Sequence, residues 1–132
     1  MARFTHMKES EAQVWERFLA NLPWRAVAVR YDVRLGEGAT LPADVPQWVR
    51  DMAWALSAKR VDAVVETADH VYLIEVKSRA SLSAVGQLLG YELLYRRQYG
   101  SAKGITLVLV CESIAPDVEP VLERYGIELH VV

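Results

Sequence analysis

The feature that most limits how this chain can fold is a pair of apolar segments joined by a very short connection. Residues 59–66 and 71–77 are rich in β-branched side chains, and only residues 67–70 lie between them. A connection of this length joins two neighbouring strands into an antiparallel hairpin. If residues 67–70 close the hairpin symmetrically, Glu66 lies opposite Val71, and this pair fixes the register of all the others.

This register divides the hairpin into an apolar face and a charged face, because side chains alternate between the two sides of a strand. The apolar face consists of Val61, Ala63, Val65, Tyr72, Ile74 and Val76. On the charged face Asp62 lies directly opposite Glu75, and Arg60 lies opposite Lys77. Two facing carboxylates repel each other, so the stability of the hairpin gives no reason to place them there. The charged face is therefore where we expect a functional site.

Helices and strands alternate along the rest of the chain. Ser10 begins a capping box that ends at Gln13, and apolar residues at helical spacing predict a helix over about residues 10–22. Further strands are expected at 24–33, 105–111 and 127–132, and further helices at 47–57, 81–99 and 116–125. This order predicts a single α/β domain over residues 1–132, in which helices flank a mixed sheet.

Charge and cysteine content narrow the range of functions. The 132 residues carry a net charge of −2, so the chain is not a polycation that holds nucleic acid by its overall charge. Basic residues exceed acidic ones between Lys77 and Lys103, which permits a local anionic partner. Cys111 is the single cysteine, and this excludes both an internal disulfide and a zinc site built from thiolates. No apolar run approaches the roughly 20 residues needed to cross a bilayer, so we expect an intracellular protein of the cytoplasm.

Asp62, Glu75 and Lys77 together favour the chemistry of a divalent metal. A hard divalent cation takes oxygen ligands from one or two carboxylates, main-chain carbonyls and water. The Lys77 ammonium lies on the same face as Glu75, where it can contact a phosphate oxygen or a water on the metal. Such a set suits the hydrolysis of a phosphodiester. In the alternative interpretation Glu75 and Lys77 form a salt bridge on an exposed strand, and a register shifted by one residue would separate Asp62 from Glu75.

The helix after the hairpin adds polar residues to this end of the fold. Only residues 78–80 separate Lys77 from a helix capped by Ser81, so the N-terminus of that helix should lie near the charged end of the hairpin. Free N–H groups there favour an anion such as a phosphate. Gln87 and Tyr91 share one face of the helix. Gln87 could hold the attacking water or a metal ligand, and Tyr91 could contact a backbone or a base, unless both are ordinary, partly buried positions.

The same helix carries a series of tyrosines at intervals of four residues. The series is Tyr91, Tyr95 and Tyr99, with Arg96 and Arg97 beside it. Such a series is more often part of a core or a dimer surface than a platform for stacking bases. The neighbouring arginines leave a role facing nucleic acid open.

These motifs resemble those of a known group of nucleases. Asp62, followed by Glu75-Val76-Lys77 and Gln87-Leu-Leu-Gly-Tyr91, resembles the PD-(D/E)XK nuclease superfamily, and within it the members with a Gln-x-x-x-Tyr helix, such as RecB-type nucleases. Residues 71–132 are also similar to the nuclease domain of NucS (EndoMS)-type mismatch endonucleases. The resemblance implies a restriction-endonuclease-like fold with an αβββαβ core.

The resemblance also implies a role for each matching residue. The implied catalytic residues are Asp62, Glu75, Lys77 and Gln87. The implied ligands of Mg²⁺ or Mn²⁺ are Asp62, Glu75, the main-chain carbonyl of Val76 and an acid of the first helix, Glu11 before Glu16. The expected contacts to nucleic acid are Tyr91, Arg79 and Ser81. Val61 stands where many relatives have proline before the first acid.

We therefore expect a divalent-metal-dependent DNA nuclease that selects DNA structures or is targeted by a partner. A homodimer or a targeting partner protein would supply the recognition that so small a domain lacks. The insertion at residues 36–57, with Trp48, Arg50 and Trp54, could contact bases or a partner chain, although buried tryptophans are commoner. The alternative is a catalytically inactive module of the same fold that binds protein or nucleic acid.

Overall fold

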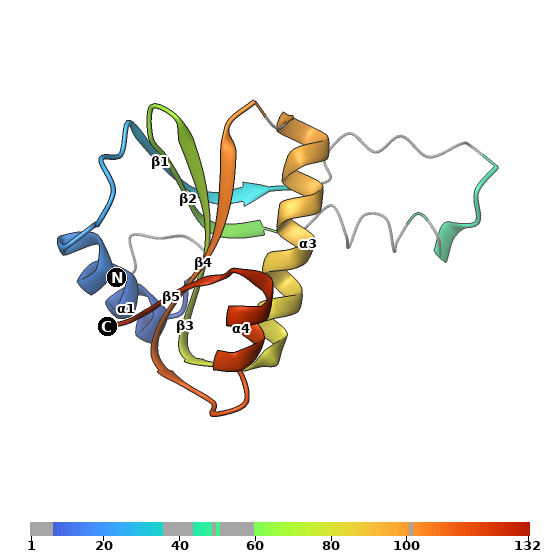
Figure 1. Ribbon diagram of the computed structural model, residues 1–132. Helices are drawn as coiled ribbons and strands as arrows, with labels where there is room; N and C mark the ends of the chain where they lie inside the picture. The colour runs from blue at the N-terminus through green and yellow to red at the C-terminus, as the bar shows by residue number, and fades with distance from the viewer. Residues whose placement is uncertain (1–6, 36–43, 49, 51–59, 101) are drawn as a thin grey trace.

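The computed structural model describes residues 7–35, 44–48, 50, 60–100 and 102–132 of the chain, which form an α/β fold. The elements in chain order are α1 (Glu9–Ala20), β1 (Ala28–Arg34), β2 (Arg60–Glu66), β3 (His70–Ala80), α3 (Leu82–Tyr99), β4 (Gly104–Ile114), α4 (Glu119–Tyr125) and β5 (Glu128–Val131). Figure 1 shows α1 on one side of the sheet and α3 and α4 on the other. None of the described helices has the length and apolarity that a membrane span requires.

The five strands form one mixed sheet in the order β1-β2-β3-β4-β5. β1 pairs with β2 and β2 with β3 in antiparallel fashion, whereas β3 with β4 and β4 with β5 are parallel. The connection from β3 through α3 to β4 is the helical crossover that parallel neighbours need. The predicted α/β class, with a mixed sheet flanked by helices, is confirmed.

The central strand β3 is buried on both faces, which explains why its sequence reads as a nearly continuous apolar run. The cluster beneath α1 contains Val14, Trp15, Phe18, Ala63, Val65, Ile74 and Val76. The cluster beneath α3 and α4 contains Val61, Val64, Leu73, Leu88, Leu109 and Leu122. Val61 therefore lies on the face opposite to the one that the alternation predicts.

The predicted register of the hairpin is confirmed close to its turn but does not continue along its whole length. The observed partners are Glu66 with Val71, Val65 with Tyr72, Val64 with Leu73 and Ala63 with Ile74. The ladder between β2 and β3 ends there. The expected pairs of Asp62 with Glu75 and of Arg60 with Lys77 do not belong to it, because β2 leaves β3 at Asp62.

The first helix begins slightly earlier than the sequence pattern predicts. The Lys8 N–H donates to Glu11 Oε1 at 3.2 Å, so Lys8 and Glu11, and not Ser10 and Gln13, form the one capping hydrogen bond at this end of the helix. The helix ends at Ala20 and β1 starts at Ala28, four residues after the predicted start.

The remaining boundaries agree with the sequence to within a few residues. β3 and β4 run three residues past their predicted ends, and α4 starts three residues after the predicted position. Most of the predicted helix at 47–57, Trp54 included, lies outside the described residues. Of the part that is described, the Arg50 N–H donates to the Pro46 carbonyl at 3.2 Å, and Trp48 is exposed.

Candidate active site

Asp62 and Glu75 come together where β2 separates from β3. Asp62 Oδ2 accepts a hydrogen bond of 2.9 Å from the Val76 N–H, a donor that the main chain of β2 no longer reaches. The carboxyl groups of Asp62 and Glu75 lie close enough to interact, and each influences the pKa of the other. The sequence correctly predicted the pair, although the side chain of Asp62 makes the contact and not the ladder.

A reversal of faces in β1 and β2 accompanies this change. The β1–β2 partners around it are Tyr31 with Ala63 and Val33 with Val61. Val33 and Val61 pack beneath α3, whereas Tyr31 and Ala63 pack beneath α1. Between these pairs Asp32 has a φ of 51°, in the left-handed region that residues other than glycine rarely adopt. The irregular backbone at Asp32 lies opposite Asp62 and interrupts the alternation of side chains between the two faces of the sheet. The sequence did not predict this irregularity, because nothing in the sequence around Asp32 distinguishes it from an ordinary strand residue.

Glu75 is the most deeply buried acid of the site. Its residue exposure is 2%, and among the described residues Glu75 Oε1 has no hydrogen-bond partner. Lys77 Nζ lies 3.4 Å from the other oxygen, Oε2, and the Lys77 side chain is 30% exposed. Burial, and then the charge of Asp62, raises the pKa of Glu75 well above its ordinary value. Burial is also the largest cause of the raised pKa of Asp62.

The α3 helix covers the carboxylates with its middle and not with its N-terminus. β3 continues for three residues beyond Lys77, which places the start of α3 roughly 10 Å beyond that lysine at about 3.3 Å per residue. The helix then packs along the sheet, and Tyr91 in its middle lies near the two carboxyl groups. Residues 78–80 are extended and not a loop, so the helix N-terminus begins three strand residues beyond Lys77, at the end of β3 to which the prediction assigned it.

Gln87 and Tyr91 are the residues that α3 contributes. Gln87 Oε1 is buried and, within the described part of the chain, makes no hydrogen bond. Tyr91 is 5% exposed, and burial raises the pKa of its hydroxyl, with smaller contributions from the charges of Glu75 and Asp62. The phenol therefore stays protonated near the two carboxyl groups and can act only as a neutral hydrogen-bond donor or acceptor.

Glu11 faces the site from α1 without joining the carboxyl pair. Its charge contributes to the raised pKa of Asp62, whereas its own carboxylate accepts the hydrogen bond from Lys8. Glu16 lies five residues further along, on a different face of the helix, and is exposed. In the described ranges no three side chains of His, Cys, Asp or Glu lie close enough to form a metal cage. Glu11 is therefore near the site, but the structure does not bring it together with Asp62 and Glu75 as a ligand set.

Arg79 and Ser81 lie beyond the site. Arg79 is exposed and pairs in register with Ser113 of β4. Ser81 is the N-cap of α3, as predicted, but its hydroxyl bonds the Ser83 hydroxyl at 2.9 Å and no main-chain group. Both residues are available to solvent at the end of β3, separated from the carboxyl pair by the last residues of that strand.

The donor set fits a hard divalent cation that keeps part of its water. Mg²⁺ in proteins is commonly held by only one or two carboxylates, with water completing its coordination. Asp62 and Glu75 provide the carboxylates, and Glu75 Oε1 and Gln87 Oε1 are buried oxygens that find no hydrogen-bond partner in the part of the chain that the structure describes. A buried, unsatisfied oxygen is costly unless a proton or a cation compensates it. The two oxygens are therefore what a cation site at this point would need.

The fold and the carboxylate–lysine arrangement together define a restriction-endonuclease-like domain. The sequence profile of the family described as "Endonuclease NucS C-terminal domain" matches residues 54–132. Because the match covers more than half of the residues of this chain, the chain belongs to the NucS C-terminal domain family. The predicted resemblance to NucS (EndoMS)-type nuclease domains is confirmed.

A solved structure shows the same fold. The chain is similar to the protein in the "Structure of EndoMS-dsDNA2 complex", with a TM-score of 0.54 and 17% sequence identity over 96% of this chain. The match covers 46% of that EndoMS chain, so this chain spans about half of its length. A search of curated proteins found no match.

Proposed function

We propose that this domain hydrolyses phosphodiester bonds of DNA with the help of Mg²⁺ or Mn²⁺. The observation that carries the proposal is the pair of buried Glu75 and half-buried Asp62, in which one Glu75 oxygen lacks a partner within the described residues. A domain that only bound protein or DNA would gain nothing from placing two repelling acids together, one of them buried. Membership of an endonuclease family and the likeness to a protein solved with double-stranded DNA support the choice of substrate.

Asp62 and Glu75 are the proposed ligands, together with the Val76 carbonyl and the Gln87 amide oxygen. A divalent cation bound there would supply positive charge to the phosphate and lower the pKa of the attacking water. Glu11 is a proposed outer acid, which acts on Asp62 through its charge. The buried surroundings strengthen all these electrostatic interactions, because water screens them less than at the surface.

Lys77 and Tyr91 are proposed to act on the phosphate and the water. The Lys77 ammonium lies 3.4 Å from Glu75 Oε2 and is partly exposed, so it would be able to contact a phosphate oxygen at the site. It then stabilises the negative charge that grows on the phosphate during the attack. Tyr91 remains a neutral phenol and can orient a water or a phosphate oxygen through one hydrogen bond. Arg79 and Ser81 stay proposed contacts to the DNA backbone on the exposed side of the site.

Selection of the substrate is proposed to depend on more than this domain. The chain spans less than half of the similar EndoMS chain. A homodimer or a partner protein would then direct the site to a mismatch, a flap, a branch or an end.

The test is cleavage of labelled single-stranded, duplex, mismatched, flapped and four-way-junction DNA in Mn²⁺. We expect cleavage of at least one substrate by the wild type and none by Glu75→Gln, whose amide keeps the shape of the side chain. Glu123→Gln, on the exposed side of α4, is the matched control and should cut like the wild type. Absence of cleavage on every substrate, with no change in melting temperature on addition of metal, would indicate an inactive binding module instead.

A further inference from the structure

A half-open hollow, separate from the carboxyl pair, lies at the other end of α3 from Gln87. It has a volume of about 270 Å³ and lies between the last turn of that helix, β1, β2 and the start of β4. Its polar lining comprises Arg30, Glu66, Tyr95, Tyr99 and Lys103, and small apolar side chains complete it. None of these residues contributes to the carboxyl pair of Asp62 and Glu75. The volume lies just below the roughly 300–1,000 Å³ of typical small-molecule pockets, so the hollow suits an occupant no larger than one nucleotide.

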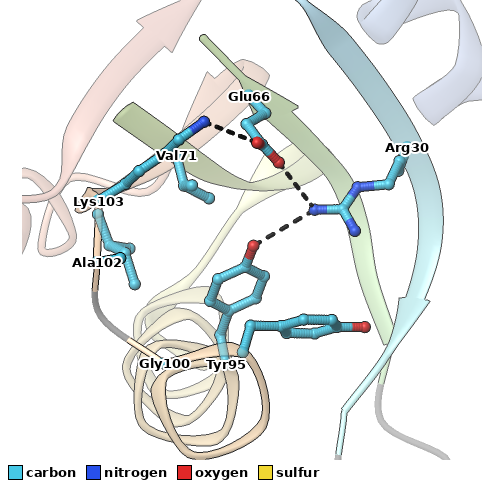
Figure 2. Close-up of a pocket in the computed structure, with 9 residues that line it drawn as sticks. Arg30, Glu66, Val71, Tyr95, Gly100, Ala102 and Lys103 are labelled. Carbon is cyan, nitrogen blue, oxygen red and sulfur yellow. Dashed lines mark hydrogen bonds and ion pairs between the residues drawn. The ribbon is translucent and has the colours of Figure 1, made fainter. Parts of the chain in front are cut away.

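Glu66 holds two cations at the rim of this hollow, as Figure 2 shows. Lys103 Nζ lies 2.8 Å from Glu66 Oε2, and Arg30 Nη2 lies 3.4 Å from Oε1. The hydrogen bond from Lys103 is the largest cause of the lowered pKa of Glu66, so the carboxylate stays ionised. Arg30 and Lys103 carry two positive charges and Glu66 one negative charge, so one positive charge remains that a phosphate group can neutralise.

The aromatic wall of the hollow includes one half-exposed tyrosine beside these cations. Tyr99 is 47% exposed, and its ring centre lies 4.6 Å from that of Tyr95, which is buried. Arg30 Cζ lies 5.8 Å from the centre of the Tyr99 ring, and Arg30 Nη2 donates to the Tyr95 hydroxyl at 3.3 Å. A half-exposed tyrosine ring that packs against a buried one is a surface on which a planar base can stack. The tyrosine series of α3 therefore divides into Tyr91 at the carboxyl pair and the other two at this hollow.

We propose that the hollow binds one nucleotide with an unpaired base, which stacks on Tyr99 while its phosphate meets Arg30 and Lys103. If the nucleotide belongs to the DNA strand that is cut, the proposal rests on the proposed nuclease function, because α3 reaches both the carboxyl pair, at Tyr91, and the hollow, at Tyr99. Tyr91 and Tyr99 are eight residues apart, or roughly 12 Å at about 1.5 Å per residue of helix. That distance equals three or four nucleotide steps of about 3.4 Å in a stacked strand. A strand that reaches the carboxyl pair can therefore place a second nucleotide in the hollow.

The test compares the binding of a fluorescent single-stranded oligonucleotide to Tyr99→Ala and to Tyr125→Ala by anisotropy in EDTA. Tyr125 on α4 is similarly exposed, at 55%, and lies outside the hollow, which makes it the matched control. We expect Tyr99→Ala to raise the Kd roughly 5- to 100-fold, the usual effect of removing an aromatic side chain that stacks on a base. Tyr125→Ala should bind within about two-fold of the wild type, and Tyr99→Trp should restore binding. Because EDTA removes divalent metal, a domain that never cuts DNA can still pass this test.

Two further arms identify the occupant. A fully paired duplex offers no free base, so Tyr99→Ala should leave its Kd within about two-fold, whereas an equal loss on duplex and single strand would overturn base stacking. If the wild type binds free dAMP and Tyr99→Ala does not, the hollow is a nucleotide site whose occupant is a free nucleotide. Lys103→Ala should reduce the slope of log K against log salt by about 0.7, the value of one single-strand phosphate contact. Equal binding by Tyr99→Ala and Tyr125→Ala would refute the proposal, provided that both variants melt as the wild type does.

Discussion

Replacing Glu75 by glutamine should stabilise the metal-free protein and abolish its response to divalent cations. Glu75 is buried beside Asp62, and its Oε1 has no partner within the described residues. An unsatisfied buried polar group costs roughly 1–3 kcal/mol. A neutral amide of the same shape removes the repulsion from Asp62, but it keeps one oxygen that needs a partner and gives up the attraction to Lys77. We therefore expect a gain of about 1 kcal/mol, or about 4 °C in Tm for a domain of this size.

The effect should depend on pH in a definite direction. Burial raises the pKa of Glu75 above its ordinary value of 4.5. A carboxyl whose pKa is raised by folding contributes stability that is fully present below the unfolded value and is lost as the pH rises through the folded value. The wild type should therefore lose stability relative to Glu75→Gln between about pH 5 and about pH 8, with the two proteins most alike at the acidic end.

The assay is thermal unfolding followed by circular dichroism, at both pH values, with and without Mg²⁺. A cation that binds only the folded wild type raises the free energy of unfolding by roughly 2.7 kcal/mol when its concentration is one hundred times its Kd. For Glu75→Gln we expect no such rise. Glu123→Gln on α4 controls for the loss of an exposed charge. A metal-free Glu75→Gln protein that melts below the wild type at the higher pH would refute the reasoning, since Glu75 would then be a satisfied structural group.

Lys77, Asp32 and Gly104 provide three further tests. Lys77→Ala should keep the fold and the rise of Tm with metal but lose DNA cleavage, because its ammonium is partly exposed beside Glu75; cleavage retained in a gel assay would remove it from the reaction. Asp32→Gly should be more stable to urea than Asp32→Ala by about 1 kcal/mol, because the φ of 51° suits glycine. Equal stabilities of these two variants would show that the left-handed backbone carries no penalty for alanine. Gly104→Ala should lose roughly 1–3 kcal/mol in urea unfolding, because the added Cβ would lie 2.8 Å from the His70 ring. His70→Ala in the same chain should recover part of that loss, and no recovery would exclude the ring as its cause.

The sequence predicts the hairpin well because its register depends on local features. Four turn residues and two apolar strands determine the pairing of Glu66 with Val71, and this pairing brings Asp62 close to Glu75. Glu75, Lys77, Gln87 and Tyr91 follow from the same strand and the helix after it, so their order along the chain is enough to place them.

The failures have the opposite origin, since they depend on contacts between segments far apart in the chain. The separation of β2 from β3 depends on the backbone of Asp32 in β1, a strand whose predicted start lay four residues too early. The hollow at Tyr99 requires Arg30 of β1 to lie near Lys103 before β4, and no spacing rule connects those two residues. Lys8 takes the capping role from Ser10 because the main-chain N–H, which every residue except proline has, is the donor.

The hydrogen bond from the Val76 N–H to Asp62 gives this site an internal spectroscopic reporter. A charge-assisted hydrogen bond shifts the proton resonance of its amide downfield and slows exchange of that amide with water. Val76 lies next to Glu75 in the chain, and its amide proton should respond whenever the Asp62 carboxylate gains a proton, a cation or a nearby phosphate. One labelled valine resonance can therefore follow the occupancy of the site in the intact protein, with no substrate and no chemical probe.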